Sequence, residues 1–206
     1  MNRKVILSCV MKNILPLKPI PCLMSIKNLI RQSLPFLIIL SIAEMFTGGI
    51  LSSMVFTFKN IPGLIVVVPA IIDLRGNINT ALGSRLSSAA HLGLIDVKKV
   101  FNKETKENVK ASLVLSVATA FLLGFLGWAT SIGLGYNANV LILITVTLIA
   151  GTLAGLILAV ATVSIVIVAF KRGLDPDNVA GPFLATIGDI ITVICLFGAV
   201  ILVGGI

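Results

Sequence analysis

The chain is organised around one stretch, PAIIDLRGNINTALGSRLSSAAHLGL, which runs from Pro69 to Leu94. The sequence on either side of it is almost entirely apolar. The ionisable and amide side chains of the stretch include Asp73, Arg75, Asn77, Arg85 and His91. Such groups are expensive inside an apolar span, and they usually mark an ion path or an internal pairing network. We therefore expect this stretch to hold a functional site.

The composition indicates a membrane protein. Of the 206 residues, 57% are hydrophobic and only 12% are charged, whereas a soluble domain is about a quarter charged. The net charge of +8 does not indicate nucleic-acid binding, because the charges lie in loops and near the N-terminus, and a single Trp and a single Tyr offer no stacking platform. The three cysteines form no CxxC or Cys/His cluster, so we expect neither a disulfide framework nor a zinc site.

Five apolar segments are each about as long as the roughly 20 residues that a helix needs to cross the hydrocarbon. The sequence therefore predicts an all-α polytopic membrane protein with five transmembrane helices. The five spans are Leu34–Phe58, Gly63–Leu94, Ala111–Gly133, Val140–Phe170 and Pro182–Val203. We assign residues 34–206 to this membrane domain and residues 1–33 to a separate basic segment.

The basic segment, residues 1–33, is expected to be cytoplasmic or interfacial. It holds six Lys and Arg residues and no acid, and Pro16, Pro19 and Pro21 prevent one continuous helix. The apolar run Val5–Met11 is too short for a signal peptide, and no small-residue cleavage site follows it.

The distribution of Lys and Arg predicts the orientation. The basic segment holds six, the first loop one, the second five, the third none and the fourth two. Under the positive-inside rule, the N-terminus is cytoplasmic, the C-terminus is outside and the number of spans is odd. We expect a multi-pass protein of the cell (inner) membrane. The two remaining basic residues, Arg75 and Arg85, lie inside the second span, and Glu44, Asp73 and Asp189 are the acids inside spans.

The second span carries a polar stripe. At about 100° per residue, its members fall within an arc about 80° wide. They are Asp73, Asn77, Thr80, Ser84, Ser88 and His91. Arg75 and Arg85 point elsewhere, so the stripe offers the oxygen ligands that hard divalent cations prefer. The alternative is a polar face packed against other helices.

Gly76 and Asn77 are expected to interrupt the second span, because glycine weakens a helix and broken membrane helices often turn carbonyls towards ions. The alternative is that Gly76 and Gly83 only permit close helix packing. In the fourth span, Gly151 and Gly155 form a GxxxG pattern that also indicates close helix contact.

Asp189 is the principal candidate in the fifth span. Thr186 and Thr192 share its helix face, and Ala185 lies one turn before it. A carboxylate here needs a partner from another span, which is either Arg75 or Arg85, or a cation; we favour the cation. For Glu44 we favour a structural ion pair with Arg75 or Arg85.

No catalytic constellation is present. With one His and with Cys195 in an apolar run, the chain has little material for a nucleophilic site, and it contains no GxxxxGK[ST] motif. We expect Cys195 to serve only in packing, His91 to be an interfacial hydrogen-bonding group, and the protein not to be an enzyme.

The two polar regions together resemble a known family. Pro69 followed by Leu74–Asn77 and Ala81–Ser87 resembles the first signature of MgtE-type magnesium transporters, in the form found in the animal solute-carrier relatives and their archaeal homologues. Asp175–Asn178, Pro182 and Gly188–Asp189 resemble the second signature. The resemblance covers the chain from Leu34 to the C-terminus.

The resemblance implies a pore built from spans 2 and 5 of two copies or repeats. It implies Asp189 as the central metal ligand, Gly76–Asn77 beside the pore and the Ala185 carbonyl at the ion site. Asp73 stands where the family more usually has glycine, so it either adds a carboxylate to the path or neutralises Arg75. Bacterial members carry large cytoplasmic sensing domains where this chain has residues 1–33, so we expect such regulation to be absent or to come from another protein.

These observations predict transport of divalent cations, chiefly Mg²⁺, by a homodimer or by a heterodimer with a paralogous five-span chain, in contact with membrane lipid and not with nucleic acid. The expected metal-binding residues are Asp189, Asn77, Ala185 and Asp73. The expected pore-lining residues are Gly76, Thr80, Ser84, Ser88, Thr186 and Thr192. The alternatives are a sodium- or proton-coupled exchanger on the same scaffold, and a non-transporting scaffold subunit.

Overall fold

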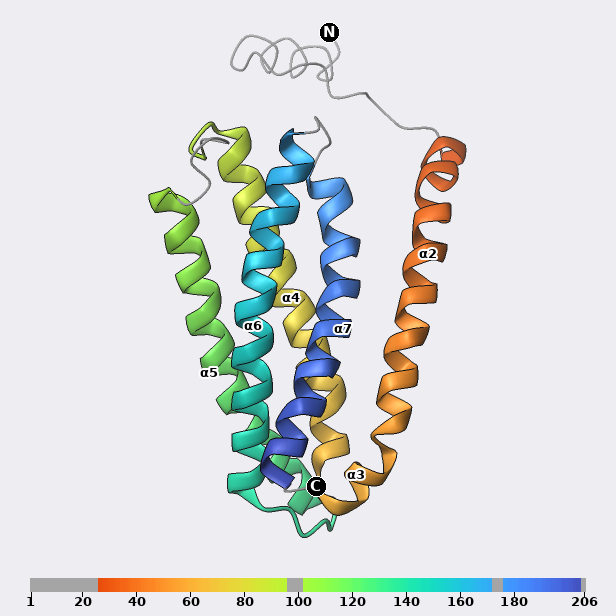
Figure 1. Cartoon of the computed structure of the whole chain (residues 1–206), viewed down its shortest axis with the longest axis vertical. Helices are drawn as coiled ribbons and strands as arrows, with labels where there is room; N and C mark the ends of the chain where they lie inside the picture. The colour runs from red at the N-terminus through yellow and green to blue at the C-terminus, as the bar shows by residue number, and fades with distance from the viewer. Residues whose placement is uncertain (1–25, 96–101, 172–175, 205–206) are drawn as a thin grey trace, which may run out of the picture. The chain divides into compact units, whose positions relative to one another are not determined.

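A computed structural model describes residues 26–95, 102–171 and 176–204, and every regular element in these ranges is a helix (Figure 1). The helices are α2 (Ile26–Ser53), α3 (Val55–Asn60), α4 (Leu64–His91), α5 (Lys103–Gly133), α6 (Val140–Lys171) and α7 (Pro176–Gly204). The chain falls into two units, Met1–Ile38 and Ile39–Ile206, and the packing described below lies within the second. Most of the predicted basic segment, and Asp175 of the second signature, lie outside the described residues.

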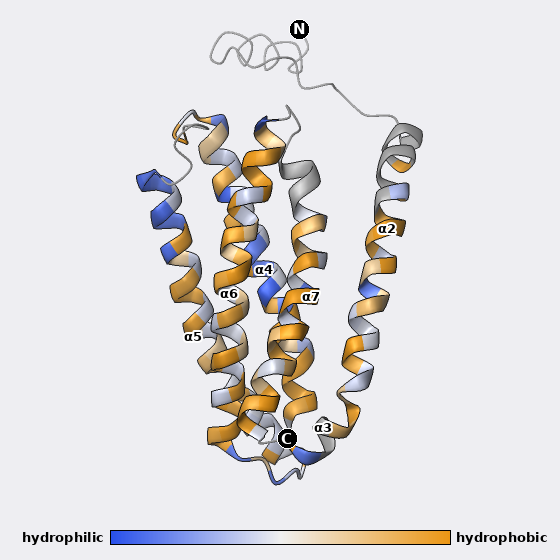
Figure 2. Cartoon of the chain, in the orientation of Figure 1, coloured by the Kyte–Doolittle hydropathy of each residue, from blue (hydrophilic) through white to orange (hydrophobic). Residues whose placement is uncertain are grey.

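Among the described residues, four helices are long and apolar enough to cross a membrane: α4, α5, α6 and the Gly181–Gly204 part of α7 (Figure 2). They match the predicted spans 2 to 5. In the predicted first span, the apolar helical part is shorter, Leu37–Ser53, and the helix is interrupted at Met54 before α3 begins. The chain is thus a helical, multi-pass membrane protein, and the fifth crossing stays a prediction.

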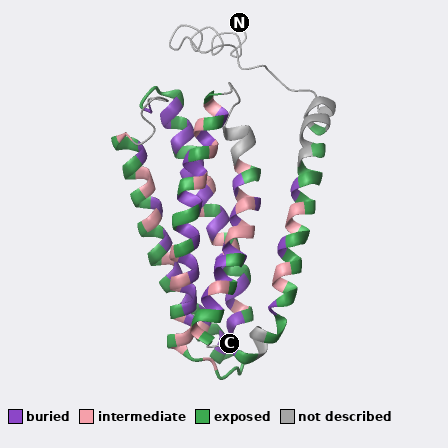
Figure 3. Ribbon diagram, in the orientation of Figure 1, coloured by how far each residue is buried: buried purple, intermediate pink, exposed green. Residues whose placement is uncertain are grey.

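The four long helices form a bundle in which α4 contacts α5, α6 and α7, and α6 also contacts α5 and α7. Figure 3 shows buried residues running along α4, α6 and α7. One apolar cluster includes Leu64, Val67, Ile71, Val146 and Leu196, and a second surrounds Leu82, Leu86 and Leu184. Cys195 is a free, buried thiol that packs with Ala154 and Leu158.

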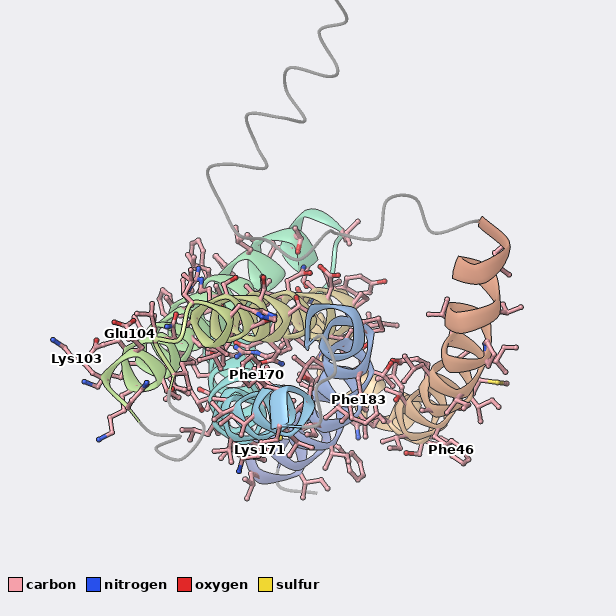
Figure 4. The ribbon with its side chains drawn as sticks, turned by 90° about the horizontal axis from the view of Figure 1, so that it is seen from above. Phe46, Lys103, Glu104, Phe170, Lys171 and Phe183 are labelled. Carbon is pink, nitrogen blue, oxygen red and sulfur yellow. The ribbon has the colours of Figure 1, made fainter. Side chains whose placement is uncertain are left out.

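A polar side chain caps the N-terminus of α5. The Asn102 side chain accepts a hydrogen bond from the Thr105 amide at 2.9 Å and donates one to the Leu94 carbonyl at 2.6 Å. It therefore ties the start of α5 to the segment that follows α4. Beyond this cap, Lys103 and Glu104 project away from the bundle (Figure 4). Gly63, directly before α4, has a φ of 86°, which favours glycine.

Small residues set the distance between α5 and its neighbours. A Cβ on Gly124 would lie 2.6 Å from the Ile144 Cα of α6, and a Cβ on Gly127 would meet the Val67 side chain of α4. Both glycines are buried, so these faces of α5 allow backbones to approach closely.

We expect Gly124→Ala to destabilise the bundle by about 1–3 kcal/mol, because the added methyl group must push α5 away from the α6 backbone. Gly133→Ala is the matched control on the same helix, since nothing lies within 4 Å of its Cβ position. Thermal unfolding in detergent measures both. Equal melting temperatures for the two variants would contradict this account of the α5–α6 contact.

Candidate functional site

The candidate site lies where α4 crosses α7. The two helices approach closely because both carry glycine there: a Cβ on Gly188 would lie 3.8 Å from the Gly76 Cα and 3.4 Å from Asn79 Nδ2. Asp189 follows Gly188, and its Oδ1 lies 3.8 Å from the Cβ position of Gly76. Because Gly76 has no side chain, the half-buried Asp189 carboxylate lies directly beside the α4 backbone.

Among the residues that the structure describes, the Asp189 carboxylate has acidic neighbours and no basic partner. Glu44 of α2 and Asp73 of α4 are close enough for their charges to act on it. Within the described ranges, no group donates a hydrogen bond to Asp189, and no Lys, Arg or His forms an ion pair with it. Among the described residues, no three His, Cys, Asp or Glu side chains are grouped tightly enough to hold a metal ion. The site in one chain is therefore a region of negative charge with few ligands.

The predicted polar stripe lies on the outer face of α4. Asp73, Asn77, Ser84, Ser88 and His91 are exposed in the single chain, and Thr80 is half-buried. Asn77 Nδ2 donates a hydrogen bond to Asp73 Oδ2 at 3.1 Å, so these two side chains form one polar unit. Within the chain, the His91 ring packs edge-on against Phe170 of α6, with 5.6 Å between the ring centroids, and the other members of the stripe are exposed or half-buried.

The expected interruption at Gly76 and Asn77 is wrong, because α4 is continuous from Leu64 to His91. In an apolar medium, a continuous helix satisfies its own backbone groups, whereas a break leaves them without partners. The Thr80 hydroxyl also donates to the carbonyls of Gly76 and Asn77, at 3.0 and 3.1 Å. Gly76 instead serves the close approach of α7.

The threonines of α7 are buried, unlike the stripe. Thr186 and Thr192 are 6% and 0% exposed, and the Thr192 hydroxyl donates to the Gly188 carbonyl at 2.6 Å. Ala185 is half-buried within the continuous helix α7, where its carbonyl takes part in the helical hydrogen-bonding pattern. A threonine oxygen bound in this way still keeps a free lone pair.

The two arginines of α4 lie in different surroundings. Arg75 is 1% exposed, and its Nη2 donates to the Ser116 carbonyl of α5 at 2.8 Å. Arg85 is exposed and lines a hollow of about 170 Å³ with Asn77 and Ser112. In the part of the chain that the structure describes, neither arginine forms the expected ion pair with Glu44.

Asn79 is a site residue that the sequence reasoning missed. Its side chain is 2% exposed beside Gly188, and Nδ2 has no hydrogen-bond partner among the described residues. The signal was present in the sequence, because three residues after Gly76 a helix returns to nearly the same face. Asn79 lies outside the arc of the predicted stripe, on a different face of α4.

The family model of MgtE, described as a divalent cation transporter, matches residues 68–199. This range contains the polar stripe, both glycines of the helix crossing and Asp189. The chain belongs to the MgtE family. The family is one of transporters and not of enzymes, which agrees with the expectation drawn from the lack of a catalytic constellation.

Sequence similarity to individual proteins leads to the same family. The chain is 34% identical to solute carrier family 41 member 3 of Rattus norvegicus over 165 residues, which cover 75% of this chain and 35% of the relative. It is 32% identical to solute carrier family 41 member 2 of Mus musculus, over 68% of this chain and 25% of the relative. It is 27% identical to the magnesium transporter MgtE of Bacillus subtilis (strain 168), over 81% of this chain and 35% of the relative. The match thus spans about a third or less of each relative.

We expect Asp189→Asn to stabilise the protein by about 1 kcal/mol when no divalent metal is present, since it removes an unpartnered carboxylate that Glu44 and Asp73 repel. Thermal unfolding in excess chelator tests this. Glu107→Gln is the control, because its exposed carboxylate pairs with Lys110 at 3.3 Å. A lower melting temperature for Asp189→Asn would show that the carboxylate has a structural partner.

Proposed function

We propose that this chain transports divalent cations, chiefly Mg²⁺, along a path lined by α4 and α7. The observation that carries the proposal is the Asp189 carboxylate, which lies within an apolar helix, faces Gly76 of α4 and has no basic partner among the described residues. An intramembrane carboxylate of this kind is a functional site by default. Membership of the MgtE family supports the same conclusion.

The few ligands of the site suit a hydrated ion. Mg²⁺ gives up its water reluctantly and is usually held by one or two carboxylates together with several waters. Asp189 is the central ligand in this proposal, and the Asp73–Asn77 pair adds carboxylate and amide oxygens. The oxygens of Thr80, Ser84 and Ser88 continue the polar lining along α4.

We further propose that the path is completed by a second chain, either another copy or a paralogue. The stripe of α4 is exposed in one chain, although its helix is apolar enough to cross a membrane. Polar side chains at membrane depth face a bundle interior or a water-filled cavity and not lipid. A partner that presents its own α4 and α7 would cover the stripe and double the number of carboxylates at the path.

Asp189→Asn should abolish Mg²⁺ uptake by proteoliposomes, reducing the initial rate at least about 100-fold, because the neutral amide loses the charge that replaces the ion's lost hydration. Glu107→Gln should transport like the unmodified protein. Uptake by Asp189→Asn at the unmodified rate, with equal protein per vesicle, would overturn the assignment of the path.

The second-chain proposal predicts cross-linking through the stripe. In a protein whose Cys9, Cys22 and Cys195 are replaced by alanine, Ser84→Cys should give dimers with a short bifunctional maleimide. Ser164→Cys, on the exposed side of α6, should give few. Equal dimer yields for the two variants would argue against a partner on the stripe.

A coupled exchanger is the second candidate, because Glu44 and Asp73 interact electrostatically with Asp189 and such a group of acids can bind Na⁺ or H⁺. Uptake measured with and without an imposed Na⁺ or pH gradient separates the two candidates. A non-transporting scaffold, the third candidate, would show no uptake and no Mg²⁺ binding that depends on Asp189.

A further inference from the structure

Arg75 occupies a slot between α4, α5 and α6. Its guanidinium lies against Gly151 and Gly155, the GxxxG pair of α6, while Nη2 donates to the Ser116 carbonyl of α5. At 1% exposure, Arg75 is the largest of the fully buried side chains. The GxxxG pair thus admits an arginine head group as well as a neighbouring helix.

Both glycines of the slot are needed for this arrangement. A Cβ on Gly151 would lie 2.8 Å from Arg75 Nη2 and 2.7 Å from the Ala120 Cβ. A Cβ on Gly155 would lie 3.0 Å from Arg75 Nη1 and 2.9 Å from Ser116 Oγ. These separations are shorter than ordinary van der Waals contact, so alanine at either position would displace the guanidinium or spread the helices.

The free energy of folding alone does not explain why a buried arginine occupies this slot. Nε and Nη1 of Arg75 have no acceptor among the described residues, and no described carboxylate pairs with the guanidinium. A buried donor without a partner is destabilising, and an apolar side chain of similar volume often packs at least as well as a buried charge. What Arg75 does provide is a directional contact to two helices.

A directional contact matters on α4 because the buried apolar side chains of this helix lie on either side of its middle part. Between Ile71 and Leu82 the buried positions are Arg75, Gly76 and Asn79, and none of them carries an apolar side chain. Apolar packing therefore fixes the rotation of this middle part less strongly than that of the parts on either side. The residue that follows Arg75 is Gly76, which must face Asp189, and the next is Asn77, which lies on the stripe.

We propose that Arg75 is a positioning residue: its guanidinium, seated on Gly151 and Gly155, fixes the rotation of α4 and so holds Gly76 against Asp189 and the stripe towards the path. The consequence for transport rests on the proposed function. The rotation itself does not, and it can be measured without any metal.

The test measures thiol accessibility on two faces of α4. In the full chain with its three cysteines replaced by alanine, Ser84→Cys places a thiol on the exposed face and Ser87→Cys places one on the buried face. Maleimide labelling should be at least about tenfold faster for Ser84→Cys, as expected for an exposed against a buried position. Adding Arg75→Gln should reduce this ratio to about threefold or less, by slowing the first variant and accelerating the second.

Matched glycine variants test the slot itself. Gly155→Ala should change the labelling ratio in the same direction as Arg75→Gln, and the two together should do no more than either alone, because they break one contact. Gly198→Ala on α7, whose Cβ position has nothing within 4 Å, should leave the ratio unchanged. Arg75→Lys should lower the labelling ratio less than Arg75→Gln does, since an ammonium keeps the charge but lacks the planar fork.

Three results would overturn the proposal. The first is an unchanged labelling ratio in Arg75→Gln. The second is equal acceleration at both positions, which indicates a loosened bundle and not a rotated helix. The third is additive effects of Arg75→Gln and Gly155→Ala.

If Arg75→Gln does not insert into the membrane, the labelling ratios of Gly151→Ala and Gly155→Ala test the proposal in its place. Absence of Mg²⁺ uptake by the unmodified protein would refute the proposed function while leaving the labelling result valid.

Discussion

The candidate site depends on the close approach of α4 and α7 at Gly76 and Gly188. With no driving force from water inside a bilayer, helices associate through close packing, and small residues permit it. Here the small residues that bring the two helices together also place Asp189 beside the α4 backbone at Gly76. The packing of α4 on α7 and the position of the candidate site are thus consequences of one pair of glycines.

The uncovered polar face of α4 constrains the assembly. Its exposed members, among them Asp73, Asn77 and Ser84, lie on a helix that is apolar enough to cross a membrane. Hydrocarbon cannot satisfy such groups, and this is the physical reason for the proposed second chain. The hydrogen bond between Asn77 and Asp73 satisfies part of this need within α4 and leaves the remaining oxygens for water or an ion.

Much of the fold and part of the site could be predicted from the sequence, because apolar length and helical periodicity are local properties. Four predicted spans match α4 to α7, and the 100° rule placed the stripe on one face and Arg75 on another. Contacts between helices could not be read in this way. Gly151 and Gly155 were interpreted as a helix contact, since nothing in their own span shows that they receive Arg75 from α4. The break expected at Gly76 failed because glycine weakens a helix in water, whereas a bilayer penalises unpaired backbone groups more strongly.

The arrangement of charge on α4 follows from its helical geometry. Arg75 and Gly76 are about 100° apart on the helix, so a guanidinium directed at α5 and α6 is directed away from the carboxylate beside Gly76. If Arg75 faced Asp189 instead, the two charges would neutralise each other and a cation would have to displace the arginine. With Arg75 held in its slot, the charged groups that act on Asp189 among the described residues are the acids Glu44 and Asp73. Under the proposed function a cation completes this site, and the proposed seating of Arg75 leaves the site available to it.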